Sequence, residues 1–129
     1  PDLPRLADAD GSARKVSRVC GSVVTVDVKL AGDRVAAIGL DAEACALGQA
    51  SAAILAANGV GATVQEIAAA RDGLQAMLKA GAAPPTGRFW ELRHLEGVRD
   101  YPPRHASTLL AFEAAVAAIE AAQAKARQA

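Results

Sequence analysis

An alternating stretch from Val23 to Leu30 constrains the fold more than any other part of the sequence. One face would carry Val24, Val26, Val28 and Leu30, and the other Val23, Thr25, Asp27 and Lys29. Alternation with a period of two is typical of a half-buried strand. The turn-forming AGD at 31–33 follows, and RVAAIGLDAEA after it can return as an antiparallel partner. The sequence therefore predicts a β-hairpin.

Helical patterns follow the hairpin. The small residues of ALGQASAAILAANG have high helix propensity, and Asn58 or Gly59 can end this helix in the left-handed conformation. Thr63 and Glu66 have the spacing of a capping box, which begins a second helix that Gly81 ends. We therefore expect two helices directly after the hairpin.

The C-terminal third predicts a long final helix. After the proline-stiffened YPPRHAS, this helix is expected to begin near Ser107. Its apolar side chains recur at steps of three and four residues, at Leu109, Phe112, Val116 and Ile119. The segment that begins with Phe89, Trp90 and Leu92 precedes it, holds nearly all the aromatic mass and is expected to anchor the core.

The order of these elements defines the fold class. Residues 1–17, rich in Pro, Asp, Gly, Ser and Arg, are expected to form an extended or loop segment laid on the domain. A hairpin followed by helices predicts an α+β fold, in which helices pack on one face of a small antiparallel sheet. A length of 129 residues suits one core, so we expect a single domain over 1–129. Because no phosphate-binding glycine motif is present, a nucleotide-dependent enzyme is not expected.

The balance of charged residues limits the class of binding partner, and the number of cysteines indicates the cellular compartment. The 14 basic residues balance the 14 acidic ones, so we expect neither a nucleic acid nor a membrane partner. Two cysteines cannot build a dense disulfide framework, which favours a reducing cytoplasm and free thiols. We expect no apolar run long enough to cross a bilayer, and hence a soluble, cytoplasmic protein.

Three side chains that can bind metals lie where loops meet regular elements. Cys20 precedes a predicted strand, Cys45 a predicted helix, and His105 the final helix. A thiolate near a helix N-terminus has a lowered pKa, and thiolate is the form that both metals and sulfur-transfer partners need. The sequence also allows plainer interpretations: both cysteines as small buried hydrophobes, and His105 as a capping or core residue.

Three further polar residues have ordinary roles open to them. Glu43, close to the second cysteine, is expected to be a surface carboxylate, and His94 a solvated or packing side chain. Ser107 is placed to cap the final helix at its N-terminus.

Three segments in order resemble the IscU/NifU N-terminal-type iron–sulfur cluster assembly scaffolds, including their SufU branch. VCGSVVTVDVKL is similar to the family's Cys-Gly-Asp and first strand. EACALGQASAAILAANGVGATVQE is similar to its second cysteine segment, and GVRDYPPRHASTLLAFEAA to the SufU-type segment that holds the third cysteine. Together these segments reach from about residue 16 to 116.

The resemblance implies a solvent-accessible cysteine site for zinc or a nascent iron–sulfur cluster on a SufE/NifU-like fold. Cys20 and Cys45 match the first two family cysteines. Ser22 stands where the family has aspartate, Ala62 where it commonly has lysine, and Ser107 where it has the third cysteine. The chain is thus identified as a divergent member that lacks the third cysteine.

His105 is a possible substitute for the missing ligand, because imidazole binds zinc and clusters well. Ala106 takes the place of the histidine that the IscU branch has beside its third cysteine, so His105 is not an aligned family residue. Ser22, Glu43 and Ser107 are weaker candidates that could orient or complete the site; a serine oxygen in particular is a poor iron ligand.

Three functions follow from the resemblance. The first is a scaffold or carrier without turnover of its own, which receives sulfur from a PLP-dependent cysteine desulfurase and passes clusters to acceptor apo-proteins. The second is a sulfur acceptor that takes a persulfide, because the SufE-type desulfurase activators resemble this chain in having Cys-x-Ser before the strand. The third is a metal-free family member that acts as an interaction module.

Overall fold

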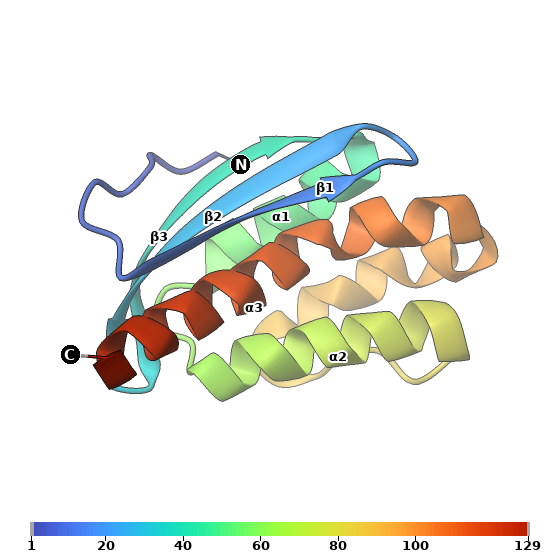
Figure 1. Ribbon diagram of the computed structural model, residues 1–129. Helices are drawn as coiled ribbons and strands as arrows, with labels where there is room; N and C mark the ends of the chain where they lie inside the picture. The colour runs from blue at the N-terminus through green and yellow to red at the C-terminus, as the bar shows by residue number, and fades with distance from the viewer. Residues whose placement is uncertain (1, 129) are drawn as a thin grey trace.

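The sheet lies on one side of the molecule and the helices on the other, in a computed structural model that describes residues 2–128 (Figure 1). The strands are β1 (Gly11–Ser17), β2 (Ser22–Ala31) and β3 (Arg34–Glu43), antiparallel in the order β1-β2-β3. The helical elements are α1 (Ala46–Asn58), α2 (Val64–Ala80), the 3₁₀ segments η1 (Gly87–Asp100) and η2 (Pro102–Arg104), and α3 (His105–Gln128). The predicted α+β class, with helices on one face of the sheet, is confirmed.

The predicted hairpin is formed by β2 and β3. Val24, Val26 and Val28 are fully buried against the helices, as their alternation predicted. Gly32 has a φ of 62°, which the tight turn between the strands requires and which glycine adopts without a steric cost. The hairpin is therefore the best predicted part of the sheet.

The strand β1 corrects the prediction that residues 1–17 form only an extended or loop segment. Residues 11–17 pair with β2 in one continuous antiparallel register. Their sequence, GSARKVS, has no apolar alternation, and pairing with the edge of β2 makes it a strand. Gly11 permits this pairing beneath α3, because an added Cβ would lie 2.2 Å from the Ala118 carbonyl oxygen.

Residues 2–10, the N-terminal strap, do lie on the domain as an extended segment. Leu3 exchanges backbone hydrogen bonds with Leu40 at the edge of β3, and the Asp10 N–H donates to the Val28 carbonyl of β2 at 2.8 Å. Between these points the strap passes over the outer face of the sheet, opposite the helices (Figure 1).

A buried carboxylate holds the strap to the sheet. The side chain of Asp27 is 1% exposed and accepts two hydrogen bonds from the Arg5 guanidinium, at 2.6 and 3.0 Å. It also accepts from the Leu6 N–H at 3.0 Å and the Ser12 hydroxyl at 2.6 Å. The Arg5 hydrogen bond is the largest cause that lowers the pKa of Asp27 to about 2.

α3 is the central helix of the core. The side chains predicted to face inward are buried: Leu109, Phe112, Val116 and Ile119. Phe112 packs edge-on against Phe89, with ring centroids 5.4 Å apart. The segment that Phe89 begins does anchor the core through Phe89 and Leu92, which are buried, whereas Trp90 is about half exposed.

The ends of the helices show which capping predictions succeed. The Thr63 hydroxyl accepts from the Glu66 N–H at 3.0 Å, and the Glu66 carboxylate accepts from the Thr63 N–H at 2.9 Å, which confirms the capping box. Gly81 ends α2 with a φ of 67°. Gly59, with a φ of −75°, does not end α1 in the left-handed conformation. α3 begins at His105, so Ser107 lies in its first turn and is not the N-cap that was predicted.

The helical stretch Pro102–Gln128 is long and apolar enough by composition to cross a bilayer, which corrects the expectation that no apolar run has this length. However, 72% of its most apolar window is buried inside the protein, where α3 packs against the sheet and the other helices. Such burial is typical of a core helix.

Candidate functional site

Three points where loops meet strands or helices lie together at one end of the molecule. Cys20 lies in the turn between β1 and β2, and Cys45 lies between β3 and α1. Ser107 lies in the first turn of α3, and its hydroxyl is 3.5 Å from the Cys45 sulfur. The antiparallel order of the strands brings the end of β3 beside the start of β2, so the two cysteine loops become neighbours.

Cys20 is exposed and is surrounded by hydroxyl groups. Its sulfur lies 2.9 Å from the Ser22 hydroxyl oxygen and 3.8 Å from that of Ser17. Ser17 and Ser22 face each other where the β1–β2 pairing closes, so the turn places both beside the thiol. The hydrogen bond with Ser22 is the main cause that lowers the pKa of Cys20 from the ordinary 9.0 to about 7. Cys20 therefore carries a large thiolate fraction at neutral pH.

Cys45 is half-buried and occupies the N-cap position of α1, with φ −65° and ψ 172°. Burial raises the pKa of its thiol. The Ser107 hydroxyl and the Gly48 and Leu47 N–H groups at the start of α1 outweigh this effect, so the pKa lies below its ordinary value. This is the stabilisation of a thiolate at a helix N-terminus that the sequence indicated.

Two serines connect the cysteine loops. The Ser22 hydroxyl, beside the Cys20 sulfur, also accepts from the Cys45 N–H at 3.4 Å. The Ser107 hydroxyl accepts from the Cys45 thiol and donates to the Arg104 carbonyl at 3.2 Å. Both serines are buried, so their hydroxyls have fixed partners.

Gly48 lets α1 approach α3 closely enough for this contact. A Cβ at this position would lie 2.7 Å from the Ala44 Cβ and 3.2 Å from the Ser107 carbonyl oxygen. A side chain would therefore press α1 away from α3 and separate Cys45 from Ser107.

The structure does not bring His105 to the cysteines. Its ring is buried, and Nε2 lies 3.1 Å from both the Val98 and the Arg99 carbonyl oxygens. Both partners are acceptors, so Nε2 carries the proton and donates, which leaves no lone pair there for a metal. Within residues 2–128, no three His, Cys, Asp or Glu side chains gather as a metal site.

The remaining candidates divide between the site and the surface. Ser22 and Ser107 lie in the site, and Glu43 is exposed at the end of β3. His94 is exposed, as predicted, and stacks edge-on with Trp90 at 5.7 Å. Sequence reasoning missed Ser17, because its place beside Cys20 depends on the unpredicted strand β1.

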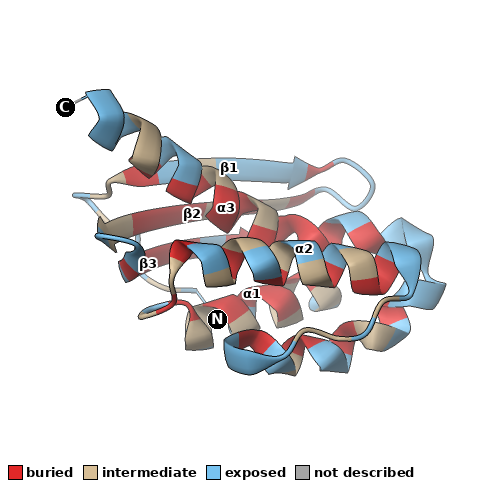
Figure 2. Ribbon diagram, turned by 90° about the horizontal axis from the view of Figure 1, so that it is seen from below, coloured by how far each residue is buried: buried red, intermediate tan, exposed pale blue. Residues whose placement is uncertain are grey.

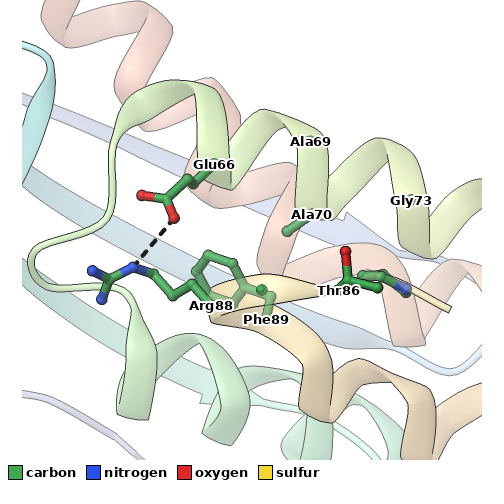
Figure 3. Close-up of a pocket in the computed structure, with 9 residues that line it drawn as sticks. Glu66, Ala69, Ala70, Gly73, Thr86, Arg88 and Phe89 are labelled. Carbon is green, nitrogen blue, oxygen red and sulfur yellow. Dashed lines mark ion pairs between the residues drawn. The ribbon is translucent and has the colours of Figure 1, made fainter.

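A separate hollow of about 250 Å³ lies between α2 and the segment that leads into η1 (Figure 3). Its lining includes Ala69, Thr86 and Phe89, and Arg88 lies 3.6 Å from Glu66 at one end. Arg88 also donates to a backbone carbonyl of α1, so its charge and donors are engaged within the fold. The hollow shares no residue with the cysteine site, which holds the more reactive groups.

Comparison with solved structures identifies the class of protein. The fold matches a NifU-like N-terminal protein from Brucella abortus with a TM-score of 0.91 and 45% identity, over 93% of this chain and 83% of that one. It also matches a protein from Fervidobacterium islandicum AW-1, described as an iron–sulfur cluster assembly scaffold for the SUF system. That match has a TM-score of 0.77 and 22% identity, over 84% of this chain and 79% of that one. No protein-family model and no curated protein matches the sequence.

A small antiparallel sheet, covered on one face by helices, defines a NifU-like fold. At 45% identity over nearly the whole chain, the protein belongs to the IscU/NifU-type scaffold family. The family resemblance drawn from the sequence is thereby confirmed.

Proposed function

We propose that this protein is an iron–sulfur cluster assembly scaffold or carrier that binds a nascent cluster, or zinc, through Cys20 and Cys45. The observation that carries the proposal is the pair of cysteine loops at one end of the fold, joined by Ser22. Family membership supports the general role.

The chemistry of the donors fits such a cargo. Thiolates are the protein ligands of iron–sulfur clusters and common ligands of zinc. The pKa of Cys20 is about 7 and that of Cys45 is lowered, so neither thiol needs a strong base to become a ligand. Cys20 is exposed, which gives an incoming cargo access to the site.

The proposed partners follow from this role. Sulfur comes from a cysteine desulfurase, whose PLP belongs to that enzyme, and completed clusters pass to acceptor apo-proteins. The protein itself holds and hands on its cargo without turnover, in the reducing cytoplasm where free thiols persist.

Anaerobic reconstitution tests the proposal. The purified protein is incubated with iron and sulfide, or with zinc alone, and the bound metal is measured after gel filtration. The parent should retain metal, and Cys20→Ala, Cys45→Ala and the double variant should lose it. His94→Ala, which removes an exposed imidazole elsewhere, is the control and should bind like the parent. Metal content unchanged in the double variant would refute the proposal.

A second function, that of a sulfur acceptor, is favoured by one observation. Cys20 is exposed with a pKa of about 7, which suits a thiolate that attacks a persulfide. Incubation with a desulfurase and free cysteine should then add the mass of one sulfur atom to Cys20, and Cys20→Ala should show no adduct. A protein that neither binds metal nor gains sulfur would be the metal-free interaction module.

A further inference from the structure

The site holds a pair of thiols whose loops one hydroxyl group joins. Cys20 and Cys45 are the only cysteines of the sequence. The Ser22 hydroxyl oxygen lies 2.9 Å from the Cys20 sulfur and 3.4 Å from the Cys45 backbone nitrogen, so a single oxygen atom connects the thiol of one to the backbone of the other. Two neighbouring thiols can together give up two electrons and close a disulfide, which a single thiol cannot do.

A second hydroxyl group lies near both sulfurs. The Ser107 oxygen is 3.5 Å from the Cys45 sulfur. After the larger effect of Ser22, the hydrogen bond of Ser107 also lowers the pKa of Cys20. Ser22 and Ser107 are both buried, so their hydroxyls hold fixed positions. The two cysteine side chains are thus arranged around the same pair of serines.

The two cysteines differ in how an incoming reagent reaches them. Cys20 lies in the exposed turn of residues 18–21, which is the pale blue loop that joins β1 and β2 in Figure 2. An added Cβ at Gly21 would meet no atom within 4 Å, so this turn has open space beside it. Cys45 is half-buried at the N-cap of α1. A sulfur atom delivered by another protein therefore reaches Cys20, and Cys45 faces Cys20 from the side of the fold.

Hydroxyl groups surround the Cys20 sulfur, which would carry a delivered sulfur atom. The Ser22 oxygen is 2.9 Å away and the Ser17 oxygen 3.8 Å away, and both serines are buried. A hydroxyl donates hydrogen bonds to anionic sulfur, and donors that are already in place stabilise a negative charge as it develops. The surroundings of Cys20 therefore suit a reaction in which an anionic sulfur atom departs.

We propose that Cys45 resolves a persulfide carried by Cys20 and releases its outer sulfur atom as sulfide. This inference rests on the sulfur-accepting step of the proposed function and names the source of the electrons. The Cys45 thiolate attacks the inner sulfur of the persulfide, which lies beside Ser22, because the outer sulfur of the exposed Cys20 faces solvent. The bond between the two persulfide sulfurs breaks, a disulfide between Cys20 and Cys45 forms, and hydrosulfide leaves with the electron pair.

The step balances without any further reactant. The proton of the Cys45 thiol passes to the departing hydrosulfide. The transferred atom arrives at the oxidation level of elemental sulfur and leaves as sulfide, and its two electrons come from the pair of thiols, which end as a disulfide. A dithiol reductant then restores both thiols by thiol–disulfide exchange, so each chain releases one sulfide per reduction. Sulfide is the inorganic component of an iron–sulfur cluster, so the product suits the proposed cargo.

Anaerobic sulfur loading tests the inference. The reduced, chelator-treated protein is incubated with a cysteine desulfurase and one equivalent of cysteine, and the released sulfide and the intact mass are measured together. The parent should release one sulfide per chain above the desulfurase alone and lose the mass of two hydrogen atoms as the disulfide closes. Cys45→Ser keeps the size of the side chain but should retain the sulfur on Cys20 and release sulfide at least about tenfold more slowly. His94→Ala, which changes an exposed imidazole outside the site, is the control and should behave like the parent.

The other possible results separate the inference from the role on which it rests. A persulfide that persists on Cys20 of the parent, with no disulfide, would overturn the inference but leave the sulfur-accepting role intact. Sulfur recovered on Cys45 of the parent would also overturn it, because the thiolate would then have attacked the outer sulfur. Absence of sulfur from both the parent and Cys45→Ser, with no sulfide released, would refute the sulfur-accepting role itself. Metal binding in the reconstitution assay is independent of all three results.

A chemical oxidant tests whether the two sulfurs can meet, without a desulfurase. One equivalent of the thiol oxidant diamide should close a disulfide within one chain of the parent, seen as a single-chain band on a non-reducing gel that takes up no alkylating reagent. Disulfides formed only between chains, or two thiols that stay free while the circular dichroism spectrum is unchanged, would overturn the inference, because Cys45 could then not reach the Cys20 sulfur.

Discussion

Asp27 provides the most quantitative test of how the N-terminal strap is held. Its carboxylate lies beneath the strap and accepts hydrogen bonds from Arg5, Leu6 and Ser12. Asp27→Asn keeps the shape of the side chain but removes its charge. The variant therefore isolates the contribution of the ionised form, which the Arg5 guanidinium and the other donors favour.

The size of the effect follows from the pKa of Asp27. A pKa of about 2 in the folded protein, in place of the ordinary 3.8, corresponds to about 2.5 kcal/mol at neutral pH. Water screens the charge of Arg5, whose side chain is 56% exposed, so we expect about 2 kcal/mol in practice. Because folding lowers this pKa, the stabilisation is complete above about pH 4 and is lost as the pH falls through about 2.

Urea unfolding of both proteins at a series of pH values measures this contribution. The parent should exceed Asp27→Asn by about 2 kcal/mol in the free energy of unfolding at pH 7, and the difference should nearly vanish at the acid end. A difference that stays constant across the series would show that the carboxylate charge is not what stabilises the strap.

Three further variants test the site and the sheet. Ser22→Ala should raise the pKa of Cys20 toward 9.0, measured by the pH dependence of its alkylation rate, and an unchanged profile would remove the serine from that role. His105→Ala should cost about 1–3 kcal/mol in urea unfolding, because the buried Val98 carbonyl and the part-buried Arg99 carbonyl lose their donor, yet leave zinc binding intact; loss of zinc would make the histidine a ligand after all. Gly11→Ala should destabilise the fold by about 2 kcal/mol or more in the same assay, because its Cβ would meet the backbone of α3, and a neutral effect would contradict the packing of β1 described above.

The elements that could be predicted well are those with a clear pattern in the local sequence. The β2–β3 hairpin follows from valine alternation, and α2 follows from the capping box of Thr63 and Glu66. Strand β1 could not be predicted in this way, since GSARKVS has no apolar period and becomes a strand only by pairing with β2. Ser17 was missed with it, although its position opposite Ser22 places it beside Cys20.

In the candidate site, too, some residues could be identified from the local sequence and others depend on tertiary packing. The sequence identified Cys20 and Cys45 by their positions before regular elements, and the fold brings those loops together through Ser22. His105 occupies an equally suitable position in sequence, but its ring turns toward the end of η1 to donate to the Val98 carbonyl. The direction of a side chain at a helix start depends on tertiary packing, which no local pattern records.

The two thiols differ in exposure and in pKa, which on the proposed function would set the order in which a cargo reaches them. The pKa of Cys20 is lowered to about 7, and the charge of its thiolate opposes ionisation of Cys45, whose pKa is also lowered. On the proposed function, a cation bound by the exposed Cys20 thiolate would offset this opposition with its positive charge. The Ser107 hydroxyl can then turn its proton from the Arg104 carbonyl to the new thiolate. The Thr108 hydroxyl, 2.7 Å from the same carbonyl, keeps that part-buried acceptor satisfied. On the proposed function, Ser107 would therefore help Cys45 to ionise, and we expect the cargo to contact the exposed Cys20 before the half-buried Cys45.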